Sequence, residues 1–299
     1  MSTVSVVIPT YRGGTLLRDA VASVQAQTLA DWELIIVSDG CDDDFSDLEE
    51  IGPRVRVFKQ RNRGISIARN VGVSLSQSEY IAFLDDDDRM LPERLRSQVE
   101  ALSDERIGLC HTQFQFIDEL GDVKGPGNSK ESQYLDFLRD DGIVLFASTM
   151  MRKSVFQAVG GFGSLFPKSE DIDFLYRVAR EGPILFLPEV LTEYRRHPAN
   201  TSVTMLGSWE RRLVLEQHLF VSEVHGEKES VRAIRRGLKY VPTERAVRAM
   251  HDAYVARYNH QRVTMLCLLG VAFLYAPRFT WRVCSNALRN DAARRRLRK

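Results

Sequence analysis

Residues 80–88 read YIAFLDDDD, a short apolar run that ends in four consecutive aspartates. An apolar run of this length is typical of a buried strand, although periodicity alone does not distinguish it from a piece of helix. Four adjacent aspartates favour neither helix nor strand, so we expect the chain to turn there. Close like charges are tolerated when a cation lies among them, and oxygen ligands suit Mg²⁺ or Mn²⁺. The stretch predicts a divalent-metal site at a strand end, with a solvated acidic turn as the alternative.

The chain before this stretch alternates strand-like and helix-like patterns. Strand-like runs fall at residues 4–8, 32–37 and 55–58, and helical spacing at 16–27 and 65–75. This alternation predicts a parallel sheet with crossover helices. Ligands of such sheets bind beyond the carboxyl ends of the strands. Asp39 and the four aspartates both fall there, although Asp39-Gly40 could also be a simple turn.

The chain after this stretch continues with mixed patterns. We expect helices at 92–102, 154–159 and 170–182, strands at 107–117, 143–151, 184–187 and 190–194, and a loop at 121–133. Glu170 and Asp171 open the third of these helices. Two carboxylates there either complement the helix dipole or serve a catalytic site.

The charge distribution divides the chain in two. Residues 1–200 carry ten more acidic than basic side chains, and residues 201–299 carry eleven more basic than acidic ones. Beyond about residue 207 the patterns are helical only. We therefore predict an α/β catalytic domain at 1–205 and a helical C-terminal module with a basic tail at 206–299. The apolar segment 263–276 would be roughly 21 Å long as a helix, too short to span a membrane, so it either packs in a core or lies on a membrane surface.

Several common sites and locations are excluded by the sequence. The four cysteines lack metal-type spacing, which predicts reduced thiols in the cytosol, and no basic leader precedes the first strand. A phosphate-binding G-x-x-x-x-G-K-[ST] loop, an H-E-x-x-H helix and a G-x-S-x-G elbow are absent. A calcium loop would need glycine at Met90 and glutamate at Arg96. A metal–diphosphate site remains.

An ordered set of short motifs resembles the family-2 glycosyltransferases with the GT-A fold. They are VSVVIPTY at 4–11, SVQAQT at 23–28, WELIIVSDG at 32–40, NRG at 62–64, ARNVG at 68–72, FLDDDD at 83–88, GGF at 160–162, EDIDF at 170–174 and YRRH at 194–197. Each motif alone is weak, but the ordered set is specific and covers about residues 3–205. The resemblance implies a GT-A type, Rossmann-like, mostly parallel sheet flanked by helices, here followed by an all-helical extension.

The resemblance also implies roles for individual residues. The side chains that line the nucleotide would be Pro9, Tyr11, Asp39 and Arg69. Asp85 would lie toward the ribose, Asp87 would bind the metal, and His197 would reach the metal or the diphosphate. Asp171 would be the catalytic base. Asp86 and Glu170 join the substrate-binding set from their places in the motifs, while the detailed roles of Asp86 and Asp88 are open. Ser38 and Cys41 depart from the family pattern, where aspartate and serine are common.

Together these features predict an inverting glycosyltransferase that uses a nucleoside-diphosphate sugar, UDP-linked, with Mn²⁺ or Mg²⁺ as cofactor. A hexosyl or N-acetylhexosaminyl group would pass to a hydroxyl of a glycan or lipid-linked acceptor. The alternatives are a non-catalytic nucleotide-sugar or glycan-binding protein and, less favoured, a sugar-phosphate nucleotidyltransferase. We expect a cytoplasmic protein, free or peripheral on the cytoplasmic face of the membrane, whose basic tail meets anionic lipid. We expect no nucleic-acid partner.

Overall fold

The computed structural model describes residues 2–139, 142, 144–197, 200, 210–243, 246, 249, 269 and 272. The chain divides into two units, which are described separately. The first unit comprises Met1–Phe137 and Gly142–Asn200, and the second comprises Leu138–Asp141 and Thr201–Lys299.

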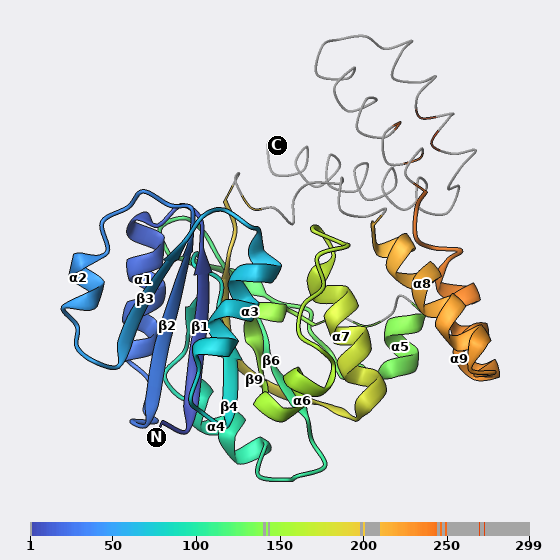
Figure 1. Ribbon diagram of the computed structural model, residues 1–299, viewed down its shortest axis with the longest axis horizontal. Coiled ribbons are helices and arrows are strands. Elements are labelled where there is room, and N and C mark those ends of the chain that lie inside the picture. Colours follow the sequence, from blue (N-terminus) through green and yellow to red (C-terminus); the bar gives the residue numbers. More distant parts are fainter. Residues whose placement is uncertain are drawn as a thin grey trace, which may run out of the picture. The chain divides into compact units, whose positions relative to one another are not determined.

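Strands and helices alternate from the first strand to the fourth, as the sequence predicts, and the order is mixed beyond it (Figure 1). In chain order they are β1 (Val4–Thr10), α1 (Gly14–Gln25), β2 (Trp32–Asp39), α2 (Ser46–Glu49), β3 (Val55–Gln60), α3 (Ile65–Leu75), β4 (Tyr80–Phe83), β5 (Arg89–Met90), α4 (Arg94–Ala101), β6 (Leu109–Ile117), β7 (Val123–Pro126), α5 (Tyr134–Leu138), the 3₁₀ turn η1 (Phe146–Ser148), β8 (Thr149–Arg152), α6 (Lys153–Ala158), α7 (Glu170–Glu181) and β9 (Ile184–Arg195).

The sheet has the strand order β3-β2-β1-β4-β8-β6-β9-β5, with β7 added on β6. β1 pairs in parallel with β2 and β4, β2 with β3, and β6 with β9. β8 is antiparallel to both β4 and β6, so β4 and β6 run the same way. The carboxyl ends of β1, β2, β3, β4, β6 and β9 therefore lie at one edge, which we call the carboxyl edge. The prediction of a mostly parallel sheet flanked by helices is confirmed.

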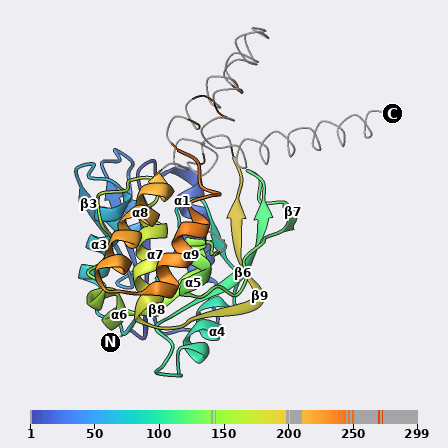
Figure 2. The same ribbon diagram turned by 90° about the vertical axis from the view of Figure 1, so that its right-hand side faces the viewer.

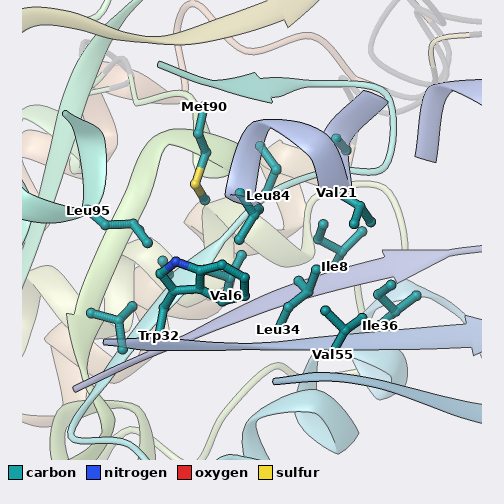
Figure 3. Close-up of a cluster of buried hydrophobic side chains, with 14 of the residues drawn as sticks. Val6, Ile8, Val21, Trp32, Leu34, Ile36, Val55, Leu84, Met90 and Leu95 are labelled. Atoms are coloured by element: carbon teal, nitrogen blue, oxygen red, sulfur yellow. The ribbon is translucent and has the colours of Figure 1, made fainter. Parts of the chain in front are cut away.

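Helices cover both faces of the sheet. On one face, apolar side chains such as Val6 and Leu34 pack with Val21 of α1 and Leu95 of α4 (Figure 3). On the other face, Ile35 and Val37 pack against Ala68 of α3. α7 lies on this second face as well, because its Phe174 joins a ring cluster that includes Phe83 of β4 and Phe146 and Phe162. We call this second face the α7 face.

The two strands predicted on either side of residue 188 are a single strand in the structure. Residues 184–187 and 190–194 both belong to β9, despite Pro188 between them. β9 stays continuous because its register on β6 shifts: Thr112 pairs with Leu187, and Gln113 with Val190. Pro188 and Glu189 bulge out of the ladder, so the missing proline N–H costs no hydrogen bond there.

Two further predicted boundaries are wrong. The predicted loop 121–133 contains β7, which pairs with β6 to form a hairpin beside β9 (Figure 2). The predicted strand 143–151 begins only at Thr149. Ser148 and Thr149 donate hydroxyl hydrogen bonds back to Leu145 O (2.7 Å) and Phe146 O (2.8 Å), which closes a 3₁₀ turn in place of a strand.

The second unit contains α8 (Glu210–Val224) and α9 (Lys228–Gly237), in agreement with a helical C-terminal extension. Val214 and Leu215 of α8 and Ile234 of α9 are fully buried. The predicted apolar helix 263–276, apart from two positions, and the basic tail lie outside the described residues. Among the helices that the structure describes, none has both the length and the apolar character needed to cross a membrane.

One buried histidine lies in the middle of the sheet. His111 on β6 is inaccessible to solvent, and its ring centroid lies 5.0 Å from that of Phe186 on β9. Neither ring nitrogen has a hydrogen-bond partner. Burial lowers the pKa of His111 to about 4. The folded protein therefore holds this imidazole in its neutral form.

We expect His111 to make folding sensitive to mild acid. The unfolded chain takes up a proton near pH 6.5 and the folded chain only near pH 4, so stability falls as the pH drops through this window, by up to roughly 3 kcal/mol. Urea unfolding of wild type and His111→Leu at several pH values isolates this contribution as their difference. Stability curves that run parallel between pH 7 and pH 4 would contradict the expectation.

Candidate active site

The carboxyl edge gathers the acidic residues that the sequence singled out. Asp39 ends β2, and the four aspartates Asp85, Asp86, Asp87 and Asp88 follow β4. The last four form a turn in which the backbone N–H of Asp88 donates to Asp85 O at 3.2 Å. We call residues 85–88 the aspartate turn. Each of its carboxylates has a different partner.

Arg69 connects the aspartate turn to the start of α7. Its guanidinium donates to Asp85 Oδ1 at 2.9 Å and to Glu170 Oε1 at 3.0 Å. The side chain is only 3% exposed, and its guanidinium carbon lies 4.7 Å from the ring centroid of Phe146 and 5.3 Å from that of Phe162. A buried arginine between two carboxylates is the pairing that a charge needs inside a protein.

Electrostatics keep this arginine charged. Burial alone would lower the pKa of Arg69, but Asp85 and Glu170 raise it above its ordinary value. Its helix can lie close against β1 because Gly72 has no side chain: a Cβ there would overlap Val7. Gly72 lies one turn after Arg69 in α3. The close packing that this glycine allows brings Arg69 near the ends of the strands.

Asp39 anchors the loop that leads into α3. Its Oδ1 accepts hydrogen bonds from Gln60 Nε2 (2.7 Å) and from the N–H of Arg63 (2.8 Å), and its Oδ2 accepts from the N–H of Gly64 (2.8 Å). Gly64 has a φ of +87°, a conformation that favours glycine. Asp39 is nearly buried, and its contacts fix where α3 begins.

Asp86 faces the end of β1. Its Oδ2 accepts a hydrogen bond of 2.5 Å from the Thr10 hydroxyl, and burial raises the pKa of Asp86 to about 6. Pro9 is buried within β1, and Tyr11 follows the strand with 58% of its surface exposed. The structure thus brings Asp86 beside the segment that contains Pro9 and Tyr11.

Asp87 meets the chain that follows β9. His197 Nε2 lies 2.9 Å from Asp87 Oδ2, and Asn200 Nδ2 donates to the same oxygen at 3.2 Å. Asn200 also donates to Arg195 O at 3.0 Å, while its Oδ1 accepts from the N–H of His197 at 2.5 Å. Burial and the neighbouring Asp85 raise the pKa of Asp87. The sequence identified Asp87 and His197 but not Asn200.

Arg195 and Asp88 hold the backbone on both sides of the Asp87–His197 contact. Asp88 is fully buried, and its Oδ1 accepts from the N–H of Arg195 at 2.9 Å. Arg195 Nε donates to Asp87 O (2.8 Å), and the same guanidinium donates to Asp19 Oδ2 of α1 (2.5 Å) and Glu119 O (3.0 Å). Burial raises the pKa of Asp88 well above its ordinary value. The sequence analysis did not identify Arg195 as a residue that positions Asp87, because the partners of Arg195 are distant in the sequence.

Glu170 and Asp171 occupy the first turn of α7. Glu170 is nearly buried, and this burial raises its pKa to about 7, against the opposing charge of Arg69. Asp171 is half-buried, and its Oδ1 accepts from the N–H of Ile172 at 2.8 Å. The Arg69–Glu170 contact therefore holds the residue before Asp171 against the aspartate turn.

Comparison with known proteins gives consistent results. The model for glycosyl transferase family 2 matches residues 5–160. An uncharacterized glycosyltransferase of Rickettsia conorii is 31% identical over 208 residues, which cover 65% of this chain and 34% of the relative. A putative teichuronic acid biosynthesis glycosyltransferase of Bacillus subtilis is 32% identical over 123 residues, 40% of this chain and 49% of the relative. This chain spans about a third of the length of the first two relatives matched.

Solved structures confirm the fold. The structure of residues 1–349 of S. aureus TarS in complex with UDP-GlcNAc superposes with a TM-score of 0.66 at 17% sequence identity. The match covers 94% of this chain and 83% of that chain. The GT-A type architecture predicted from the motifs is therefore present.

Asn200 should position the Asp87–His197 pair. We expect Asn200→Ala to weaken Mn²⁺ binding by about tenfold or more, because residues that orient ligands typically contribute that much to metal affinity. Mn²⁺ titration followed by electron paramagnetic resonance measures the change. Gln157→Ala, which removes an exposed amide from α6, serves as the control. Equal Mn²⁺ affinities in Asn200→Ala and wild type would show that the amide does not position the pair.

Proposed function

The chain belongs to glycosyltransferase family 2, and from this premise we propose that it is an inverting transferase. It moves a hexosyl or N-acetylhexosaminyl group from a UDP-sugar to a hydroxyl group of a glycan or lipid-linked acceptor. The observation that carries the proposal is the pairing of Arg69 with both Asp85 and Glu170, which joins the aspartate turn to the start of α7.

Asp171 is the general base of this proposal. The acceptor hydroxyl loses its proton as its oxygen attacks the anomeric carbon, and a carboxylate within hydrogen-bond reach can take that proton. Glu170 is held by Arg69, and Asp171 is the next residue of α7. The hydroxyl oxygen forms the new glycosidic bond as the bond to the diphosphate breaks. A single in-line displacement of this kind inverts the anomeric carbon and needs no enzyme nucleophile.

A divalent cation fits beside Asp87 and His197. Carboxylate and imidazole are both ligands of Mn²⁺, and these two side chains converge to 2.9 Å. In the part of the chain that the structure describes, no three His, Cys, Asp or Glu residues group into a complete metal site. A Mg²⁺ or Mn²⁺ ion held by this pair would take its other ligands from substrate phosphates. When bound, such an ion neutralises the charge that develops on the leaving diphosphate.

A uridine nucleotide is the favoured donor. The fold is shared with TarS, which has been solved with UDP and with UDP-GlcNAc. In this proposal Pro9, Tyr11 and Asp39 line the nucleotide, and Asp85 lies toward the ribose. Asp39 already accepts three hydrogen bonds from residues 60–64, which leaves about one acceptor direction of its carboxylate for the base.

The proposal extends to the cellular setting. We place the protein in the cytoplasm, free or on the cytoplasmic face of the membrane, in the synthesis of a cell-envelope polysaccharide. The similarity to a teichuronic acid biosynthesis glycosyltransferase supports a polysaccharide product. The basic tail that would contact anionic lipid lies outside the described residues.

Two substitutions should separate the proposed roles. We expect Asp171→Asn to lower UDP release in the presence of acceptor glycans by about 10²–10⁴-fold while UDP binding persists, because only the proton acceptor is lost.

Asp87→Ala should instead weaken Mn²⁺-dependent UDP binding, because the proposed metal ligand is lost. UDP release and thermal stabilisation by UDP with Mn²⁺ measure the two effects.

Glu181→Gln is the matched control, since it removes an exposed carboxylate from the last residue of the same helix. Unchanged turnover in Asp171→Asn would refute the base assignment. A wild-type protein that binds UDP with Mn²⁺ but releases none from UDP-sugars, with any acceptor tried, would favour the non-catalytic binding protein.

A further inference from the structure

The helices α8 and α9 of the second unit lie side by side as an antiparallel pair (Figure 2). Two polar contacts join them. Arg235 of α9 pairs with Glu223 of α8 at 2.9 Å. Arg212 at the start of α8 donates to Leu238 O, just beyond the end of α9, at 3.1 Å. These contacts show which side of each helix faces the other helix.

The exposed sides of both helices face the same way. At about 3.6 residues per turn, the sides of each helix follow one another in the direction of the helical turn as buried, partner-facing and exposed. These sides are represented by Val214, Glu223 and Phe220 on α8, and by Gly237, Arg235 and Arg232 on α9. Because the helices run in opposite directions, this shared order places both exposed sides on one side of the pair. We call this side the outer face.

The α8 part of the outer face carries a row of apolar side chains. Phe220 is 69% exposed, Val224 66% and Leu213 39%. Their spacing of seven and four residues places the three on one side of the helix. Single exposed apolar residues are ordinary on a protein surface, but a row of three along one helix indicates a surface that meets an apolar partner.

The α9 part of the outer face carries a row of basic side chains. α9 has four basic residues and one acidic residue, Glu229. The exposed cations that follow one another at steps of four and three residues, and so form the basic row, are Lys228, Arg232, Arg236 and, just beyond the helix, Lys239. Within the part of the chain that the structure describes, no carboxylate forms an ion pair with any of the four. The outer face therefore presents unneutralised positive charge.

The acids between the two rows do not cancel this charge. Glu216 of α8 pairs with Arg212 at 2.8 Å, and Glu223 pairs with Arg235. Two members of the basic row also line a surface hollow at the junction of the helices, whose lining residues are Ser222, Glu223, Gly226, Lys228, Val231 and Arg232. A phosphate group in this hollow would accept charge-assisted hydrogen bonds from both cations.

A row of cations beside a row of apolar side chains fits the surface of an anionic bilayer. The cations face the headgroups, and the apolar row reaches the boundary of the acyl chains. Double-stranded nucleic acid would pair with the cations but would leave the row that contains Phe220 in water. Because no described helix is long and apolar enough to cross a membrane, a contact made by this part of the chain is peripheral.

We propose that the outer face of α8 and α9 binds the surface of an anionic membrane, with Phe220 and Val224 at the acyl boundary and the basic row on the headgroups. A membrane location belongs to the proposed function, but this contact is independent of the transfer chemistry. Each Lys or Arg near an anionic membrane strengthens binding about fivefold.

The test is co-sedimentation of the full-length chain with lipid vesicles. Vesicles of equal parts phosphatidylglycerol and phosphatidylcholine are compared with vesicles of phosphatidylcholine alone. We expect the wild type to bind the anionic vesicles about tenfold or more tightly, and high salt to weaken this binding. Arg232→Gln/Arg236→Gln should lower the affinity about tenfold or more. Arg232→Lys/Arg236→Lys should retain most of it, because the attraction depends on charge.

The apolar row has a test of its own in the same assay. Phe220→Gln leaves the charge of the outer face unchanged and removes its largest exposed apolar side chain. We expect this variant to bind anionic vesicles about tenfold less tightly, because the ring no longer leaves water on binding. Wild-type affinity in Phe220→Gln would overturn the placement of this row at the acyl boundary.

Arg54→Gln/Lys130→Gln is the matched control, since it removes the same charge from exposed positions of the first unit. It should bind vesicles like the wild type. Equal binding by the wild type and Arg232→Gln/Arg236→Gln would overturn the proposal, since the contact would then lie elsewhere. So would a wild type that ignores anionic vesicles, which would leave the outer face to an acidic protein partner. Thermal stabilisation by UDP with Mn²⁺, measured on every variant, confirms folding and tests the proposed function separately.

Discussion

A single buried arginine joins the parts of the site that come from different regions of the chain. Arg69 of α3 reaches Asp85 after β4 and Glu170 at the start of α7, 101 positions later in the sequence. A buried charge is stable only when paired, and removing one partner of such a pair typically costs about 3–5 kcal/mol. Each carboxylate therefore constrains the other through the arginine, and α7 is fixed relative to the strand ends.

The aspartate turn is organised by partners that approach it from separate elements. Asp85 faces Arg69, and Asp86 accepts from the end of β1. Asp87 meets the imidazole and amide that follow β9, and Asp88 is buried against the backbone N–H of Arg195. Four like charges in a row can coexist because each has its own partner and burial raises the pKa of three of them. In the proposed mechanism this arrangement separates the charge on the diphosphate from the proton taken by Asp171.

The sequence predicts much of this architecture because local patterns encode it. Alternating apolar runs and helical spacing indicate the parallel sheet, and the acids at strand ends indicate where the site lies. The antiparallel β8 and the bulge at Pro188 escape prediction because both depend on pairing between distant strands. Arg195 and Asn200 escape for the same reason, since their role appears only when the end of β9 meets the aspartate turn. A motif identifies Asp87 and His197, but not the side chains that orient them.

The central claim is that Arg69 couples the aspartate turn to the start of α7, and a double-mutant cycle tests it most directly. Free energies of unfolding are measured for wild type, Arg69→Met, Glu170→Gln and the double variant. The account predicts that Glu170→Gln recovers part of the stability lost in Arg69→Met, with a coupling of about 1 kcal/mol or more. Strictly additive losses, with no recovery in the double variant, would contradict it.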